Sequence, residues 1–160
     1  MFKIGDYITH PMHGAGVIES IVTKKINGSQ RDYYVLQLPV GDMVVMVPVS
    51  GCEDIGVRSI ISRSEAEKLF SAFSEIEISM TQNWNKRYRE NMDKIKSGNL
   101  LDVASVVKGL MCRDSERGLS TSERKMLHSA KQILISELVI ATDMDYDGVE
   151  KRLCAALKEG

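Results

Sequence analysis

The sequence predicts an α+β protein of two domains: a small, strongly bent antiparallel β-barrel over residues 1–60, followed by an all-helical domain over residues 64–160. Short apolar runs at regular spacing, separated by glycine and proline, fill the first sixty residues and are typical of such a barrel. From about residue 63 the apolar residues recur with the period of a helix. The 160 residues suit one domain or two small ones, and the 43% of apolar residues are enough for a packed core.

The first domain should contain four or five short strands. The clearest apolar runs are residues 7–10, 17–22, 33–38 and 43–49. Asn27-Gly28 predicts a tight hairpin between the second and third of these runs, because both residues tolerate positive φ. So short a chain cannot cover both faces of the sheet, and we expect an edge strand to remain open to a partner.

Helices are expected throughout the second domain. The first helix should begin near residue 64. The next should span about 83–96, a third should run from 100 or 101 to about 112, a fourth should span 120–142 and the last 149–157. Ser64 with Glu67 has the spacing of a capping box, in which each side chain binds the other residue's backbone N–H. Ser120 with Glu123 has the same spacing. Gly98 predicts a left-handed cap at the end of the second helix.

Charge is distributed unevenly along the chain. The formal net charge is −1, but residues 1–80 sum to −3, residues 81–131 to +5 and residues 132–160 to −3. A near-neutral total therefore hides a basic middle segment. Such asymmetry indicates contact with nucleic acid, although solvated helix faces often carry a similar excess.

The cysteines and the hydropathy pattern predict a cytoplasmic protein. Cys52, Cys112 and Cys154 are far apart and form no Cys-x-x-Cys pair, which is typical of reduced thiols in a cytosolic protein. No run of apolar residues has the length of a signal sequence or of a membrane span.

Motifs that would carry catalysis or metal binding are weak. His10 and His13, with His128 as a third ligand, could hold a metal, but a rigid turn is the preferred interpretation. The run from Asp143 to Gly148 resembles the start of a calcium loop, yet the position of its final glutamate is Cys154. An acidic loop that caps the next helix is therefore preferred. No phosphate-binding loop or nucleophile motif is present, so the sequence predicts neither enzyme activity, small-molecule substrate, cofactor nor metal.

The single tryptophan lies in a polar stretch. Trp84 is surrounded by amides and cations rather than by Leu, Ile and Val. One interpretation is a ring that stacks on or wedges into DNA while Lys86, Arg87 and Arg89 bind the phosphates. The other is a half-buried tryptophan at a helix start that packs on Met80 or Tyr88.

Further cations follow on the later helices. Arg124, Lys125 and Lys131 are additional candidates for phosphate contacts, and the helix start at Ser120 offers free N–H groups to a phosphate. For Arg113 and Arg117, ion pairs to the neighbouring acidic residues Asp114, Glu116 and Glu123 are the preferred interpretation.

Several motifs, in this order along the chain, resemble the CarD/CdnL family of bacterial transcription regulators. They are Phe2-Lys3-Ile4-Gly5-Asp6, His10-Pro11-x-His13-Gly14, Asn83-Trp84-x-x-Arg87-Tyr88 and Arg113-Asp114-x-Glu116-Arg117-Gly118-Leu119-Ser120-x-x-Glu123. The resemblance covers nearly the whole chain.

The resemblance implies a Tudor-like first domain that binds the β subunit of RNA polymerase, as in the transcription-repair coupling factor, and a helical domain that binds promoter DNA. The matched Trp84 would wedge into the minor groove at the upstream edge of the melted bubble, largely independently of sequence, and stabilise the open complex. The DNA-binding residues implied by the motif match and the basic pattern are Trp84, Lys86, Arg87, Arg89, Arg124, Lys125 and Lys131. Polymerase would bind the strand edge formed by Val44, Val45, Met46 and Val47, together with Lys24.

This chain departs from the family on the polymerase-facing surface. Where the family often has arginines, this sequence has Lys24, which keeps the charge, and Met46, which loses both the charge and the bidentate geometry. A protein-protein adaptor without direct DNA contact, in which Trp84 is an interface hot spot, is the alternative function.

Overall fold

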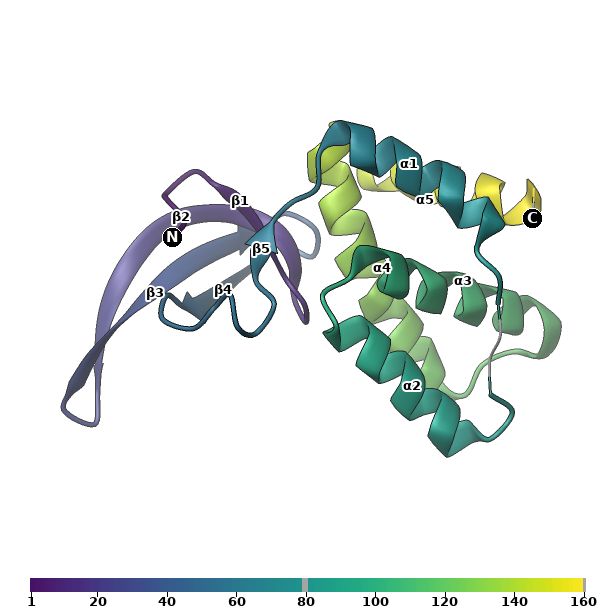
Figure 1. Cartoon of the computed structure of the whole chain (residues 1–160), viewed down its shortest axis with the longest axis horizontal. Coiled ribbons are helices and arrows are strands. Elements are labelled where there is room, and N and C mark those ends of the chain that lie inside the picture. The colour runs from purple at the N-terminus through teal and green to yellow at the C-terminus, as the bar shows by residue number, and fades with distance from the viewer. Residues whose placement is uncertain (79–80, 160) are drawn as a thin grey trace.

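The computed structural model describes residues 1–78 and 81–159, which form an antiparallel sheet followed by a helical domain (Figure 1). The strands are β1 (Tyr7–His10), β2 (Gly14–Ile26), β3 (Ser29–Leu38), β4 (Met43–Pro48) and β5 (Arg58–Ser59). The helices are α1 (Arg63–Glu75), α2 (Trp84–Lys96), α3 (Leu100–Arg117), α4 (Thr121–Thr142) and α5 (Tyr146–Glu159). The α+β layout predicted from the sequence is confirmed. None of the helices in the described residues is long and apolar enough to cross a membrane.

The sheet is organised around the long hairpin of β2 and β3. Its strand order is β4-β3-β2-β1-β5, with every neighbouring pair antiparallel. The predicted turn at Asn27-Gly28 is confirmed, because both residues have positive φ (51° and 81°) and β2 resumes as β3 directly after them. Figure 1 shows the hairpin bending away from the helical domain.

The structure does not show the closed barrel that the sequence predicts. β4 and β5 form the two edges of the sheet in the described residues. β5 has only two residues, and both of them pair with β1, so it offers little backbone with which to close the sheet. A core inside the bend is nevertheless present, and its buried residues are Ile8, Ile18, Tyr34, Leu36, Leu38, Val47, Cys52 and Val57.

The N-terminal cap of α1 lies two residues before the predicted position. Ser62, not Ser64, is the N-cap: its Oγ accepts the N–H of Glu65 at 3.1 Å, and the Glu65 carboxylate accepts the N–H of Ser62 at 3.2 Å. Glu67, which the prediction placed in the capping box, binds Arg152 of α5 at 2.8 Å. Ser62 and Ser64 are each followed three residues later by a glutamate, Glu65 or Glu67. Both serines therefore fit the capping-box pattern, and the local sequence does not distinguish them.

The later helices follow the predicted order, and α3 and α5 are longer than predicted. α3 continues five residues beyond the predicted end and stops at Gly118, whose φ is 76°. α5 begins at Tyr146 rather than Val149. Asp145 caps it, since its Oδ1 accepts the N–H of Gly148 at 2.8 Å, and the acidic run is therefore a capping loop, as the preferred interpretation states.

The helical core lies between the α3–α4 pair and the α1–α5 pair. α3 and α4 pack along each other, and α1 packs on α5. The largest fully buried side chains here are Phe73, Leu110, Leu134, Ile135, Leu138 and Leu153. The buried Lys108 ties α3 to the end of α1, because its Nζ donates to the carbonyl oxygens of Ser74 and Ile76 at 2.9 and 2.8 Å. This contact fixes the point from which the chain leaves α1 toward α2.

The sheet is joined to α4 through polar contacts that no local pattern encodes. Glu137 is fully buried and binds Arg58 of β5 through both carboxylate oxygens, at 2.8 and 3.0 Å. The same carboxylate accepts the N–H of Ile61 at 2.8 Å. At the preceding residue, Ser136 Oγ accepts the N–H of Ala15 at 2.9 Å. These contacts give the sheet and the helical domain a defined relative orientation.

Candidate nucleic-acid interface

Trp84 occupies the first position of α2 and is half-exposed. Asn83 is the N-cap, and its Oδ1 accepts the N–H of Lys86 at 3.0 Å, which starts the helix at the indole. The residue is 42% exposed, and its ring stacks on Tyr88 with a centroid distance of 5.4 Å and an interplanar angle of 23°. The other predicted packing partner, Met80, lies outside the described residues. The indole therefore packs on Tyr88 while part of its surface remains open to solvent.

Arg87 does not have the role in phosphate binding that the sequence predicts. Its residue exposure is 2%, and its guanidinium donates four hydrogen bonds within the protein. Two reach the Glu123 carboxylate at 3.0 and 3.2 Å, and two reach the carbonyl oxygens of Thr81 and Gln82 at 3.2 and 3.0 Å. A guanidinium committed in this way holds α2 against α4 and is not available to DNA.

Helix geometry explains why Arg87 differs from its neighbours. Arg87, Asn91 and Ile95 are the buried residues of α2 and recur every four residues, so they form one face. Lys86 and Arg89 point to other sides and are exposed. In the sequence, the four-residue spacing of Arg87, Asn91 and Ile95 was the one indication that Arg87 is buried. It was weak evidence, because Ile95 is the single aliphatic residue among the three.

The cations of α4 divide into two groups. Arg124 and Lys125 are exposed and lie within two turns of Ser120, the N-cap residue that contacts Trp84. Lys131 is about 16 Å further along the helix axis from Ser120 and binds Glu150 of α5 at 2.6 Å. Arg124 and Lys125 therefore lie on the end of α4 that contacts the indole, whereas Lys131 is engaged in an interhelical ion pair.

Glu123 is the acidic partner on which this site rests. Burial alone would raise the pKa of its carboxyl, but the hydrogen bonds and charge of Arg87, with the charge of Arg113 and a hydrogen bond from Ser120, outweigh burial and lower that pKa. The predicted capping box at Ser120 is therefore half correct. Ser120 does cap α4 by accepting the N–H of Glu123 at 3.2 Å, while the Glu123 carboxylate turns to Arg87.

This lowered pKa predicts a dependence of stability on acid. The folded state keeps Glu123 ionised to a lower pH than the unfolded chain, so its contribution is complete above the ordinary pKa of 4.5 and is lost as the pH falls through the folded value. We expect the free energy of unfolding, measured with urea, to fall below about pH 4.5. In the double variant Arg87→Met/Glu123→Leu, the free energy of unfolding should decrease less steeply as the pH is lowered. Identical slopes for the two proteins would show that Glu123 does not carry this dependence.

The strand edge predicted to bind polymerase is partly exposed. Val44 and Met46 are 56% and 38% exposed, Val45 is half-buried, and Val47 is 1% exposed. The side chain of Val47 faces the core, because alternate residues of a strand face opposite sides, so Val47 offers a partner only its backbone. β4 lies at an edge of the sheet in the described residues, so the exposed apolar strip of Val44 and Met46 lies on a strand whose outer backbone is unpaired there.

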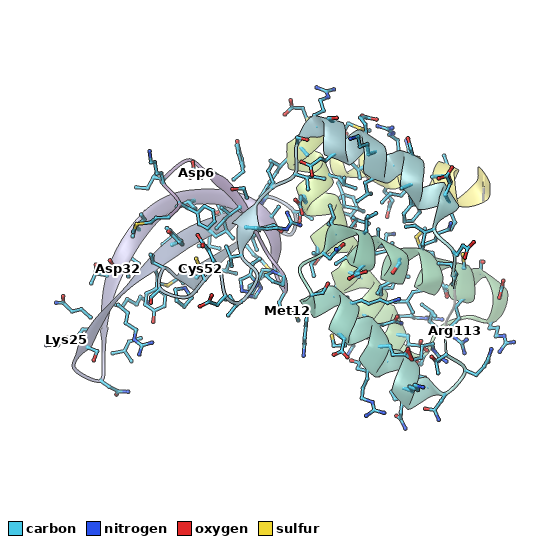
Figure 2. The ribbon with its side chains drawn as sticks, in the orientation of Figure 1. Asp6, Met12, Lys25, Asp32, Cys52 and Arg113 are labelled. Carbon is cyan, nitrogen blue, oxygen red and sulfur yellow. The ribbon has the colours of Figure 1, made fainter. Side chains whose placement is uncertain are left out.

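Lys24 lies on the hairpin beyond the end of β4, directly opposite Arg31 of β3. Both side chains are exposed. Like charges at directly opposed positions destabilise a sheet, so folding does not explain this pair. Figure 2 shows the neighbouring Lys25 near the far end of the same hairpin. Arg31 is a candidate partner-binding residue that the sequence reasoning missed, and the strand register is the observation that identifies it.

His10 and His13 lie side by side, with their ring centroids 4.6 Å apart. The His10 Nδ1 accepts the N–H of Met12 at 3.0 Å, as expected for a rigid turn. Burial and the nearby His13 lower the pKa of His10. Among residues 1–78 and 81–159, no three His, Cys, Asp or Glu side chains come together as a metal site would require.

Comparisons with known proteins agree with this two-part architecture. The family model described as "CarD-like/TRCF RID domain" matches residues 2–61, and the model described as "CarD, C-terminal domain" matches residues 68–154. A protein of Bacillus subtilis (strain 168) named "Putative transcription factor YdeB" is 39% identical over 140 residues, which cover 88% of this chain and 92% of the relative. The chain belongs to the CarD family, and the resemblance drawn from its motifs is confirmed.

Proposed function

We propose that the protein is a non-catalytic, cytoplasmic transcription regulator that binds the β subunit of RNA polymerase through its sheet and promoter DNA through the surface around Trp84. Membership of the CarD family and the name of the Bacillus subtilis relative support a role in transcription. In this proposal the two domains act together, because binding to polymerase raises the effective concentration of the helical domain at the promoter.

The half-exposed indole of Trp84 is the observation that carries the DNA proposal. An apolar side chain wedged at a base step costs unstacking energy, which is offset when nearby cations bind the adjacent phosphates. The exposed cations placed for this purpose are Lys86, Arg89, Arg124 and Lys125. Such a wedge would enter the minor groove at the upstream edge of the bubble and oppose reannealing of the strands. Readout by shape and deformability suits action at many promoters.

The exposed strip on β4 supports the polymerase proposal. Val44 and Met46 would provide apolar contact and the open backbone of β4 would pair with a strand of the partner. Lys24 and Arg31 would add charge beyond the end of β4. Arg31 offers a guanidinium for bidentate contact with a carboxylate, which Met46 cannot provide.

The test is the lifetime of the open complex on a ribosomal-type promoter with the cognate polymerase. We expect the wild-type protein to lengthen the lifetime and Trp84→Ala to lose that effect, because the wedge is gone while the fold remains. Leu101→Ala is the matched control, since Leu101 is a 51% exposed apolar residue in the first turn of α3. Equal lifetimes with Trp84→Ala and wild type, both folded and bound to polymerase, would contradict the wedge.

A protein-protein adaptor remains the second candidate, because an indole packed on Tyr88 with an exposed surface also suits an interface hot spot. Salt dependence separates the two functions. Binding of the full chain to duplex DNA that weakens steeply as salt rises supports phosphate contacts. Partner binding without any salt-dependent affinity for DNA favours the adaptor.

A further inference from the structure

The hydroxyl of Ser120 makes more contacts than helix capping requires. Its Oγ accepts the N–H of Glu123 at 3.2 Å, which is the capping bond. It also accepts the indole N–H of Trp84 at 3.4 Å and donates to Glu123 Oε1 at 3.4 Å. A serine hydroxyl has one proton to donate and two lone pairs to accept with, so this geometry uses its full capacity.

The contact with Trp84 distinguishes Ser120 from the other N-cap residues. Ser62, Asn83 and Asn99 each accept backbone N–H groups of the helix that they start. Ser120 additionally reaches a side chain 36 residues earlier, on a different helix. Since the indole has a single N–H, this bond uses its entire donor capacity.

Two contacts restrict the indole at the same time. The stacking on Tyr88 constrains the plane of the ring, and the bond to Ser120 constrains the direction in which its N–H edge points. Two torsion angles set the orientation of a tryptophan side chain, and these two contacts oppose rotation about both. The part of the ring that remains exposed is therefore presented in a defined direction.

The support beneath Ser120 is itself buried and fully engaged. Glu123, which accepts the Ser120 hydroxyl proton, is 2% exposed and binds Arg87 through both oxygens. Arg87 in turn holds the carbonyl oxygens of Thr81 and Gln82, directly before α2. The start of α2 and the start of α4 are thereby joined, which keeps the serine hydroxyl at a constant place relative to the indole.

We propose that Ser120 is a positioning residue for Trp84, which holds the indole before DNA arrives in the orientation used for wedging. Groups held in advance in the bound geometry lose less conformational freedom on binding, and this increases affinity. The consequence for DNA rests on the proposed function, whereas the orientation of the indole can be measured on the free protein.

The first experiment measures the indole directly, because Trp84 is the only tryptophan. Ser120→Gly removes the hydroxyl while glycine remains an acceptable N-cap, and Ser120→Thr keeps a hydroxyl. Acrylamide quenching and fluorescence anisotropy are compared for the full-length proteins, with circular dichroism to confirm equal helix content. We expect Ser120→Gly to lower the anisotropy and to raise the quenching constant about 1.5-fold, because the residue is already 42% exposed and the lost hydrogen bond frees the rest of the ring. Ser120→Thr should resemble wild type. Unchanged quenching and anisotropy in Ser120→Gly would overturn the proposal.

The second experiment measures open-complex lifetime with the same variants. We expect Ser120→Gly to lose a large part of the lifetime extension, about threefold or more, and Ser120→Thr to retain it. Suppose that Ser120→Gly loosens the indole but leaves the open-complex lifetime unchanged, while Trp84→Ala shortens that lifetime. This result would overturn the role of Ser120 in positioning Trp84 for DNA. If Trp84→Ala itself has no effect on lifetime, the proposed function fails, and the fluorescence result alone decides whether Ser120 orients the indole.

Discussion

Arg87→Ala is expected to destabilise the helical domain by about 3–5 kcal/mol, because it leaves the Glu123 carboxylate buried without its partner. Arg87 and Glu123 have side-chain exposures of 2% and 3%, so water cannot replace the lost hydrogen bonds without opening the contact between α2 and α4. The carbonyl oxygens of Thr81 and Gln82 lose their donor as well. Urea unfolding followed by circular dichroism measures the effect.

Arg89→Ala is the matched control for this prediction. It removes the same side chain two residues further along α2, on an exposed side of the helix, and should change stability by about 0.5 kcal/mol or less. Arg87→Met/Glu123→Leu replaces both charges with apolar groups and should recover most of the loss. A destabilisation no larger for Arg87→Ala than for Arg89→Ala would contradict the buried ion pair.

The same comparison separates folding from DNA contact. We expect Arg89→Ala to weaken DNA binding in a folded protein, since an exposed cation contributes through phosphates. Arg87→Ala should weaken it only to the extent that the start of α2 is disordered. A loss of function in Arg87→Ala is therefore evidence about the support of Trp84 and not about a phosphate contact.

Gly14→Ala is expected to destabilise the protein by about 2–4 kcal/mol, through backbone strain and overpacking together. Gly14 has φ of 92°, and a Cβ at this position would lie 2.5 Å from Ser136 Oγ and 3.3 Å from Ile133 Cα. The added methyl group would therefore push β2 away from α4 and lengthen the bond between Ala15 N–H and Ser136 Oγ. Urea unfolding gives the free energy, and amide hydrogen exchange at Ala15 reports on the junction.

Gly28→Ala isolates the strain from the steric effect. Gly28 also has positive φ, 81°, but nothing lies within 4 Å of its virtual Cβ, so only the backbone strain of about 1–2 kcal/mol is expected. Exchange at Ala15 should remain as slow as in wild type. If Gly14→Ala and Gly28→Ala behaved alike in both measurements, close packing of β2 on α4 would not be a constraint on this fold.

Features determined by neighbours in the chain were predictable from the sequence. The Asn27-Gly28 hairpin depends on the conformational preferences of two adjacent residues, and Ser120 caps α4 through an N–H three residues away. The polar surroundings of Trp84 indicated a ring near the surface, and it is half-exposed. The family motifs also follow from residue order alone, and the family assignment agrees with them.

Features that depend on distant residues were not predictable in this way. Lys86, Arg87 and Arg89 are three neighbouring cations, and only the position of Glu123, 36 residues after Arg87, makes the middle one an internal residue. The strand order places β4 and β5 at the two edges of the sheet in the described residues, and the pleat of β4 decides that Val47 is internal while Met46 is exposed.

By itself, then, the sequence determined the two-part α+β layout, the order of the helices, the family and a tryptophan set among basic residues. Only the tertiary structure decided which cation supports that tryptophan, which cations remain exposed, and how the sheet is fixed to α4 through Glu137 and Gly14. The physical reason is range: caps, turns and helical periodicity act over about four residues, whereas the partner of a buried charge is set by the packing of whole elements.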